Sequence, residues 1–342
     1  MIDNKNFFLE DEHGGDLLEA QKKYKDVSEW IDLSSGINPH PYKDFKLAKS
    51  IYNSLPSGEA IRELLSAAAV YYKLKDNSSI IAYQGAQGLI NIFPYIFSEI
   101  KKKKVQVYSP TYIEHYKSWV NAGYTIKLID SFEKEIDPSG ITIIVNPNNP
   151  DGKLFNKDAL IVLQNRIQEK NGLLIIDESF MDPTPDEKFN YSIEKKNLII
   201  IRSFGKFFGL PGLRLGFAFG DHKYINQISN FIGPWPISSS SIDIALKAMS
   251  DIQWIKQTIN QLEILSKDLE LALNAINIPI IGGTLLFKLV KFEDAGKIHN
   301  LLAKDGIWTR KFIYNNNWLR LGIPKDRVEL NYLFNSLQNI LK

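Results

Sequence analysis

Residues 203–217 read SFGKFFGLPGLRLGF, and no other stretch says more about the architecture of this protein. The stretch follows an apolar run, residues 198–201, and is rich in glycine and phenylalanine, yet it carries two cations, Lys206 and Arg214. A short apolar run of this kind is typical of a buried strand, and in open α/β sheets ligands bind beyond the carboxyl ends of the strands. The stretch therefore predicts that Lys206 lies at a ligand site.

The composition favours a protein that binds a small molecule. Its 342 residues are 44% hydrophobic and 12% aromatic, so the chain can bury a large core and exceeds the usual length of one compact domain. The net charge of +2 produces a field too weak to favour nucleic acid or an anionic membrane as a partner. The sequence contains no cysteine, which excludes disulfides, thiolate metal sites and cysteine nucleophiles.

The N-terminal sequence predicts a cytoplasmic location. Residues 1–15 lack a basic segment followed by an apolar one, as a signal peptide would have. No apolar run in the chain reaches the ~18 residues that are needed to cross a bilayer. We therefore expect no membrane partner.

Short apolar runs bounded by turn residues alternate with longer amphipathic stretches. The runs are nearly continuous in Val, Ile and Leu, which is typical of strands that helices cover on both faces. The expected strands are residues 79–83, 105–108, 141–145, 173–176, 198–201 and 215–219. Helical stretches such as residues 88–99 and 157–169 lie between them. This order predicts an α/β fold with a largely parallel sheet.

The pattern changes after Gly233-Pro234-Trp235-Pro236. A long helical stretch, residues 241–275, follows, and then a shorter mixed segment runs to the C-terminus. We therefore place a domain boundary near residue 235.

Polar or small residues follow five of the expected strands. In chain order they are Gly85-Ala86-Gln87-Gly88, Ser109-Pro110-Thr111-Tyr112, the segment NPNNPDG at residues 146–152, Asp177-Glu178, and Ser203 with Lys206. Small residues at a helix start suit a phosphate, a desolvated lysine can form a Schiff base, and an aspartate can hold a pyridine nitrogen protonated. Taken singly, these groups could be turns, a helix cap and a surface lysine, but those interpretations do not explain their order. The set predicts a pyridoxal-phosphate site.

These segments resemble motifs of the class I/II aminotransferases of fold type I. Ser203-Phe204-Gly205-Lys206 with residues 209–216 is similar to the lysine motif of that family, including an arginine eight residues after the lysine. Residues 146–152 resemble its NPNNPTG motif, and Asp177-Glu178-Ser179-Phe180 its DEAY or DEAF motif. The resemblance implies a mostly parallel seven-stranded sheet in a large domain, residues 51–234, and a smaller α+β domain, residues 235–342, which an N-terminal segment, residues 1–50, joins.

The resemblance also implies a role for each matching residue. Lys206 would form the Schiff base and then move a proton, Asp177 would pair with the pyridine nitrogen, and Tyr112 would stack on the ring. These three are the expected catalytic residues. Asn149 would bind the phenolic oxygen of the cofactor. Its phosphate would be held by the backbone of Gly85, Ala86 and Gln87, by the Ser203 hydroxyl and by Arg214. The apolar residues around Lys206 would favour its amine form.

Three positions depart from the family pattern. Phe180 stands where many relatives have a tyrosine, so Asn149 alone would bind the phenolic oxygen. Leu55-Pro56 stands where many relatives extend a tyrosine to the cofactor phosphate of the neighbouring subunit, and Tyr52 is the candidate to replace it. Gly205 replaces a serine that is common just before the lysine.

The N-terminal segment is similar to that of one subgroup. His13-Gly14-Gly15 and residues 32–39, DLSSGINP, resemble the HGG and DFSxNINP segments of the threonine-phosphate decarboxylases of cobalamin biosynthesis. The resemblance implies substrate contacts at His13, Gly14, Gly36, Asn38, Asn149, Arg310 and Arg320. Paired guanidinium donors suit a carboxylate or a phosphate, so two arginines suit a substrate with two anionic groups.

We therefore expect a homodimer that decarboxylates a small phosphorylated amino acid, L-threonine-O-3-phosphate, to (R)-1-amino-2-propanol phosphate. The alternative is an aminotransferase that acts on histidinol phosphate or a related phosphorylated or phosphonate amino compound. The two reactions differ in which bond at Cα stands perpendicular to the cofactor ring, and the sequence leaves that angle open. A non-catalytic relative is a third interpretation, but the intact Lys206, Asp177, Asn149 and Arg214 speak against it.

Overall fold

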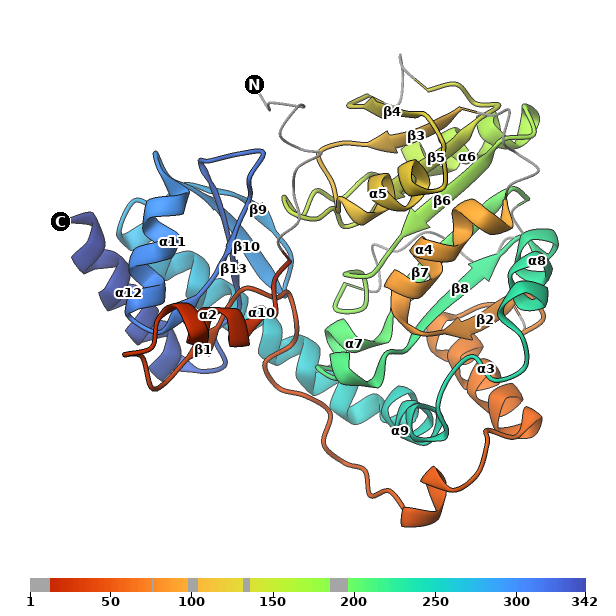
Figure 1. The fold of residues 1–342 in the computed structure, drawn as a ribbon, viewed down its shortest axis with the longest axis horizontal. Helices are drawn as coiled ribbons and strands as arrows, with labels where there is room; N and C mark the ends of the chain where they lie inside the picture. The colour runs from red at the N-terminus through yellow and green to blue at the C-terminus, as the bar shows by residue number, and fades with distance from the viewer. Residues whose placement is uncertain (1–12, 76, 98–103, 132–135, 185–195) are drawn as a thin grey trace. The chain divides into compact units, whose positions relative to one another are not determined.

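The computed structural model describes residues 13–75, 77–97, 104–131, 136–184 and 196–342 (Figure 1). The chain divides into two compact units. The first unit comprises Met1–His40, Pro150–Lys153 and Gln257–Lys342, and the second comprises Pro41–Asn149 and Leu154–Lys256. The units change over after residues 40 and 256, and the expected domain boundaries at residues 50 and 235 stay predictions.

The second unit is built on a seven-stranded sheet in the order β2-β8-β7-β6-β5-β3-β4 (Figure 1). Only β8 runs antiparallel to its neighbours β2 and β7, so the sheet is mostly parallel, as predicted. The strands are β2 (Ile80–Tyr83), β3 (Val105–Tyr108), β4 (Ile126–Ile129), β5 (Ile141–Val145), β6 (Leu173–Asp177), β7 (Leu198–Ser203) and β8 (Gly216–Gly220). The six expected strands are confirmed within two residues.

Strand β4 is the one that the sequence pattern missed. It lies at the edge of the sheet, beside β3 alone. Its sequence, IKLI, places the exposed Lys127 between apolar residues. A search for continuous apolar runs finds central strands, because those are buried on both faces, and it overlooks a half-exposed edge strand.

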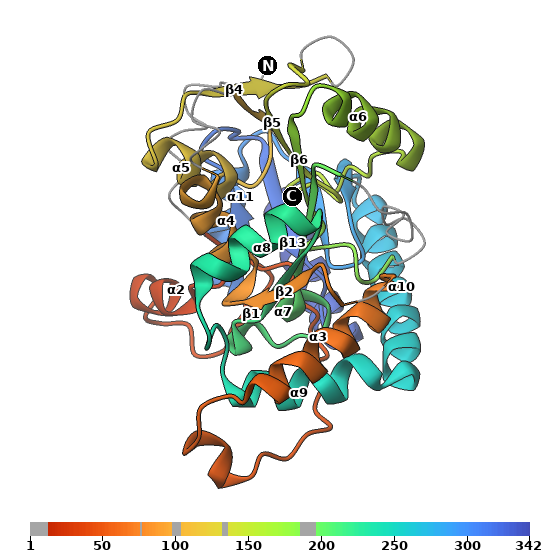
Figure 2. The same ribbon diagram turned by 90° about the vertical axis from the view of Figure 1, so that its right-hand side faces the viewer.

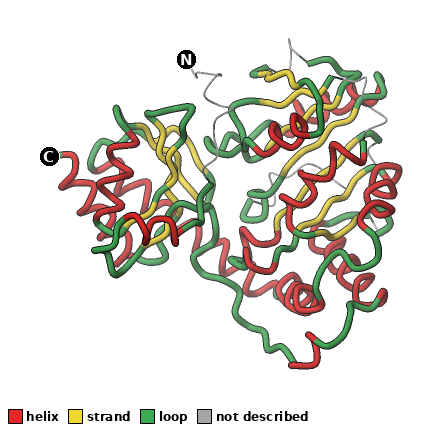
Figure 3. The backbone as a smooth tube through the Cα atoms, viewed as in Figure 1, coloured by secondary structure: helices red, strands yellow, loops and turns green. Residues whose placement is uncertain are grey.

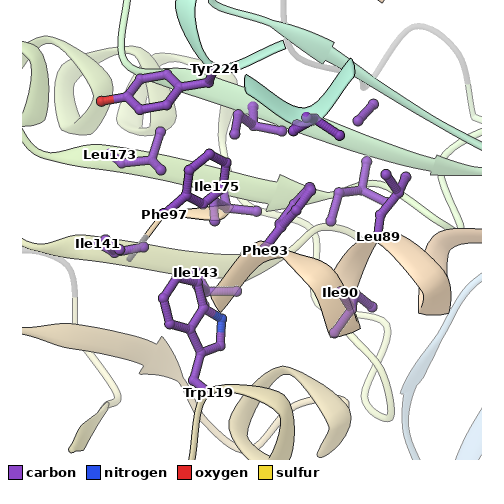
Figure 4. Close-up of a cluster of buried hydrophobic side chains, with 14 of the residues drawn as sticks. Leu89, Ile90, Phe93, Phe97, Trp119, Ile141, Ile143, Leu173, Ile175 and Tyr224 are labelled. Atoms are coloured by element: carbon purple, nitrogen blue, oxygen red, sulfur yellow. The ribbon is translucent and has the colours of Figure 1, made fainter. Parts of the chain in front are cut away.

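Helices cover both faces of this sheet. They are α3 (Gly58–Tyr72), α4 (Gly85–Ile96), α5 (Glu114–Asn121), α6 (Lys157–Glu169), α8 (His222–Ile232) and the short α7 (Phe204–Phe207). Figure 2 shows α4, α5 and α8 on one side of the sheet and α6 on the other. On the α4 side, Phe93 and Phe97 pack with Trp119 and with alternate strand residues such as Ile143 and Ile175 (Figure 4). This close-packed core therefore fixes the positions of the strands whose ends carry the predicted site residues.

The expected helical stretch over residues 241–275 is confirmed, but the structure divides it into two helices. They are α9 (Ser239–Ser250) and α10 (Ile252–Ala275), and Asp251 lies between them. The Asp251 carboxylate accepts a hydrogen bond from the backbone N–H of Trp254 at 2.9 Å, and so caps the start of α10. Helix α9 packs against α3, which places residues 239–250 in the second unit.

The first unit is a smaller α+β structure (Figure 3). Its four-stranded antiparallel sheet has the order β12-β13-β10-β9, formed by β12 (Arg310–Lys311), β13 (Trp318–Gly322), β10 (Phe287–Lys291) and β9 (Ile280–Gly283). Strand β1 (Ile31–Asp32) pairs in parallel with β11 (Ile307–Trp308). Its helices are α2 (Leu17–Lys23), α11 (Ala295–Lys304), α12 (Arg327–Leu341) and the part of α10 from Gln257 onward. The β1–β11 pairing joins the N-terminal segment to the C-terminal part of the chain.

The described helices include none that is both long and apolar enough to cross a membrane.

Candidate active site

Three parallel strands of the second unit end at the same edge of the sheet. Strand β5 ends at Val145, β6 at Asp177 and β7 at Ser203. In the register of the sheet, Val145 pairs with Asp177, and Asp177 pairs with Ile201. The polar residues after these strands are therefore neighbours, and this edge holds the predicted cofactor residues.

Asp177 is a buried carboxylate that takes part in three hydrogen bonds. Its Oδ2 lies 2.8 Å from Nε2 of His115, and its Oδ1 accepts from the N–H and the hydroxyl of Ser179 at 2.9 and 2.5 Å. A carboxylate only accepts hydrogen bonds, so Nε2 of His115 carries the proton. Burial raises the pKa of Asp177, but the hydrogen bonds from His115 and Ser179, together with the electrostatic attraction of His115, outweigh it and hold the pKa below its ordinary value. Asp177 is therefore ionised at neutral pH and suits a pyridinium N–H.

His115 and Ser179 were not identified from the sequence. His115 lies on α5, three residues after Tyr112, and its burial with a carboxylate is a tertiary contact with no local signal. Ser179 had a local signal, because a polar residue two positions after an aspartate often forms a turn with its carboxylate. The DES segment shows that turn.

Lys206 lies half-buried on the short helix α7. Its Nζ is 5.4 Å from the centre of the Phe180 ring, so the residue that replaces the tyrosine of many relatives presents an aromatic face to the amine. An aromatic face attracts a cation and stabilises Lys206 while the side chain is protonated. The structure explains the glycine at position 205, because a Cβ there would lie 2.8 Å from the Cα of Pro211.

The N-terminus of α4 and Arg214 form a cradle for an anion. Helix α4 begins at Gly85, where a Cβ would lie 2.8 Å from Nη2 of Arg214. A Cβ on Gly216 would lie 2.5 Å from the backbone nitrogen of Ala86, so β8 also passes close to this helix start. Arg214 has a positive φ of 49° and donates from Nη1 to the carbonyl of Pro211 at 3.0 Å. Helix N–H groups beside a guanidinium fit the phosphate of pyridoxal phosphate.

Tyr112 and Asn149 lie in two different loops, and a buried hydrogen bond joins these loops. The hydroxyl of Thr111 donates to Oδ1 of Asn148 at 2.6 Å, and the Asn148 amide donates to the carbonyl of Pro110 at 2.9 Å. Tyr112 and Asn149 are the next residues in each loop, so the pair fixes their separation. The predicted roles of Tyr112 and Asn149 stay predictions.

Arg310 and Arg320 lie directly opposite each other in the first unit. They pair across the antiparallel strands β12 and β13, and both are buried. Residues directly opposite in such strands point to the same face of a sheet. The Cζ of Arg310 lies 5.2 Å from the Phe312 ring, and that of Arg320 lies 5.0 Å from the Phe287 ring. The two arginine side chains thus leave the same face of the sheet.

Ser34 connects Arg320 to the N-terminal segment. Its carbonyl accepts from Nη2 of Arg320 at 2.9 Å, and its hydroxyl accepts from the N–H of Gly15 at 2.8 Å. The same hydroxyl donates to Asp32 at 2.6 Å. A Cβ on Gly14 would lie 2.1 Å from the Ser34 carbonyl oxygen, so only glycine fits there. Ser34 was missed because its contacts with Gly15 and Arg320 join parts of the chain that are far apart in the sequence.

The other predicted substrate residues of the first unit have simpler surroundings. His13 and Gly14 are exposed, and Gly36 is buried. The Asn38 side chain is buried and accepts from the N–H of His40 at 2.9 Å. The structure thus brings Gly14 close to Ser34 and Arg320, while the substrate roles of His13, Gly36 and Asn38 stay predictions.

Comparison with known proteins places this geometry in context. The family model described as aminotransferase class I and II matches residues 28–337. A threonine-phosphate decarboxylase of Pseudomonas aeruginosa is 35% identical over 318 residues, which cover 92% of this chain and 93% of the relative. A histidinol-phosphate aminotransferase of Buchnera aphidicola is 33% identical over 217 residues, which cover 60% of this chain and 58% of the relative.

A solved structure has the same fold. The histidinol-phosphate aminotransferase of Sinorhizobium meliloti, determined in complex with pyridoxal-5'-phosphate, superposes with a TM-score of 0.79. It is 15% identical, and the match covers 97% of this chain and 96% of that one. The architecture described above is thus shared far beyond the range of clear sequence identity.

Proposed function

The chain belongs to the aminotransferase class I and II family and is a pyridoxal-phosphate enzyme of fold type I, and on that premise we propose that it decarboxylates L-threonine-O-3-phosphate to (R)-1-amino-2-propanol phosphate. The observation that supports this substrate most is the opposed pair Arg310 and Arg320, anchored by Ser34 of the N-terminal segment. The substrate carries two anionic groups, a carboxylate and a phosphate. Each can take one planar guanidinium.

The residues of the second unit would hold the cofactor. Asp177, kept ionised by His115 and Ser179, would pair with the pyridine nitrogen, and the α4 N-terminus with Arg214 would bind the phosphate. Lys206 would be its covalent attachment point. When bound, pyridoxal phosphate supplies an electron sink for the electron pair that remains on Cα after carbon dioxide leaves.

The protein's own groups would choose the bond that breaks and complete the reaction. The guanidinium that binds the carboxylate would orient the substrate so that the bond from Cα to the carboxylate carbon breaks. Lys206 would then deliver a proton from Nζ to Cα, which replaces the lost carboxylate. Buried surroundings strengthen each of these charged contacts.

The second candidate is amino transfer to or from histidinol phosphate, which the similarity to histidinol-phosphate aminotransferases favours. In that reaction Lys206 would remove the proton from Cα. Histidinol phosphate has one anionic group, and a histidinol-phosphate aminotransferase that matches 91% of this chain is 28% identical, against 35% identity over 92% of the chain for the decarboxylase. Both observations favour decarboxylation.

The test compares the two reactions directly. Purified protein with pyridoxal phosphate is given L-threonine-O-3-phosphate without a keto acid, and released carbon dioxide and the phosphorylated amino alcohol are measured. We expect the two products in equal amounts. A second reaction contains histidinol phosphate and 2-oxoglutarate. Consumption of 2-oxoglutarate there, together with no carbon dioxide from threonine phosphate, would replace this proposal with amino transfer.

The proposal includes a homodimer. Tyr52 and Leu55, near the position at which many relatives reach the neighbouring subunit, are 69% and 66% exposed in the single chain, which suits residues that a second copy covers. Light scattering at micromolar concentration should report twice the mass of the chain. A fully active monomer would contradict this part of the proposal.

A further inference from the structure

The side chain of Gln87 contacts the ring that is predicted to stack on the cofactor. Gln87 lies in the first turn of α4, and its Oε1 accepts a hydrogen bond from the Tyr112 hydroxyl at 2.8 Å. The sequence suggested a role for the Gln87 backbone alone, at the phosphate. The observed contact is made by the side chain, and it reaches a residue on another element.

The orientation of the Gln87 amide is fixed by two acceptors. Its Nε2 donates to Oδ1 of Asn91 at 2.8 Å and to Oε2 of Glu114 at 3.3 Å. A carboxylate can only accept, so a flipped amide would set its oxygen against the oxygen of Glu114. The carbonyl oxygen therefore faces the Tyr112 hydroxyl.

Tyr112 is also held at its backbone and along its ring edge. The Thr111–Asn148 hydrogen bond fixes the loop that carries it. Its ring meets the His115 ring edge to face, with the centres 6.2 Å apart and the planes at 83°. His115 in turn binds Asp177. The Tyr112 ring and the Asp177 carboxylate are thus tied into one set of contacts.

We propose that the Gln87 side chain is a positioning residue that sets the plane of the Tyr112 ring for the cofactor. It acts through the Tyr112 hydroxyl. The inference rests on the predicted stacking role of Tyr112 and is independent of which substrate the enzyme uses. A ring that is already oriented loses less conformational entropy when the cofactor binds, so the cofactor binds more tightly.

The test is a double-mutant cycle on cofactor binding. Gln87→Leu keeps the backbone N–H and a similar volume but removes the acceptor, and Tyr112→Phe keeps the ring but removes the hydroxyl. The cofactor dissociation constant is measured by titrating the apo-protein with pyridoxal phosphate, and the circular dichroism of the bound cofactor reports its orientation. We expect each variant to bind about threefold to tenfold more weakly and to change the dichroism, as the loss of one neutral hydrogen bond implies.

The double variant decides how Gln87 acts. If Gln87 works through the Tyr112 hydroxyl, the double variant binds as weakly as either single variant. If the two single-variant effects on the dissociation constant multiply in the double variant, the proposal is overturned. Wild-type affinity and dichroism in Gln87→Leu would also overturn it. If Gln87→Leu does not fold, Tyr112→Phe decides alone, and an unchanged dissociation constant and dichroism there overturn the proposal.

Tyr124→Phe is the matched control. The Tyr124 hydroxyl donates to the carbonyl of Pro94 on α4 at 3.1 Å, so this variant also removes one tyrosine hydrogen bond to the same helix. It should leave the cofactor affinity and dichroism unchanged. Neither readout uses a substrate, so a failure of the decarboxylation proposal and a failure of this one are distinguished by separate measurements.

Discussion

The two units place their predicted binding residues in different ways. In the second unit, Asp177 and Ser203 end neighbouring parallel strands, and each polar group follows its strand in chain order. In the first unit, Arg320 is held by Ser34, a residue 286 positions earlier in the chain. The predicted cofactor residues therefore form a pattern in the sequence, whereas the predicted anion-binding pair depends on a contact between segments that are far apart in the chain.

The surroundings of the buried arginines differ between the two units and indicate different roles. Arg202 in the second unit is enclosed by two carboxylates of its own core, Glu178 and Asp182. Arg310 and Arg320 in the first unit lie side by side on adjacent strands. We infer that the enclosed arginine supports the fold and that the paired arginines bind the substrate. The predictions below test this division.

The largest effect is expected at Lys206. Lys206→Ala removes the proposed attachment point and proton carrier, so kcat should fall on the order of a thousandfold or more. Carbon dioxide release from threonine phosphate measures it. Lys223→Ala, on the exposed surface of α8, should keep wild-type activity. Borohydride reduction and peptide mass analysis should place the cofactor label on Lys206, and a label on another lysine would contradict the assignment.

The next effect concerns stability in the second unit. Nη1 of Arg202 lies 2.7 Å from Oε2 of Glu178, and Nη2 pairs with Asp182, with all three side chains buried. Arg202→Met leaves two buried carboxylates without their cation, which should cost about 3–5 kcal/mol of unfolding free energy. Denaturant unfolding measures it. Lys247→Ala, which breaks the exposed pair with Asp243, should cost about 0.5 kcal/mol or less. Equal losses of unfolding free energy in the two variants would contradict the distinction between the buried and the exposed ion pairs.

A smaller effect on catalysis is expected in the first unit. Arg320→Ala or Arg310→Ala removes a charge-assisted hydrogen bond to a substrate anion, worth about 1.5–3 kcal/mol, and tenfold in rate corresponds to about 1.4 kcal/mol. We expect kcat/KM to fall by about tenfold or more, while the absorption of the bound cofactor is retained. Arg327→Ala, an exposed arginine of the same unit, is the control. Loss of the cofactor band would show that the arginines do not act on the substrate alone.

The last expected effect is a pH dependence of stability that originates in the first unit. Burial and the nearby charges of Lys311, Lys23 and Arg310 lower the pKa of His299 from 6.5 to about 4. Between these values the unfolded chain binds a proton that the folded protein excludes, so stability falls as the pH is lowered, by at most about 1.4 kcal/mol per pH unit. Asp177 has a lowered pKa too, and its stabilisation is lost only below the ordinary carboxyl pKa of about 3.9.

His299→Gln should therefore flatten the unfolding free energy between pH 6.5 and 4. The control is His222→Gln, at an exposed histidine of α8, which should keep the wild-type slope. If the slope persists in His299→Gln, the acid sensitivity does not come from this histidine.

The sequence by itself determined much of the second unit. Continuous apolar runs predicted six of its seven strands, because central strands of a parallel sheet are buried on both faces. The order of the polar residues after those strands predicted that they lie along one edge of the sheet, since parallel strands end at a common edge. The helix break at Asp251 was missed, although a capping aspartate is a local signal.

Only the tertiary structure decided the contacts between residues that are far apart in the chain. His115 reaches Asp177, Gln87 reaches Tyr112, and Ser34 reaches Arg320 through hydrogen bonds that no local pattern announces. The register that sets Arg310 opposite Arg320 likewise belongs to the folded sheet. Periodicity and turn residues report how a segment is buried, whereas a side chain's partner depends on which other segment packs beside it, and that choice is made by the fold as a whole.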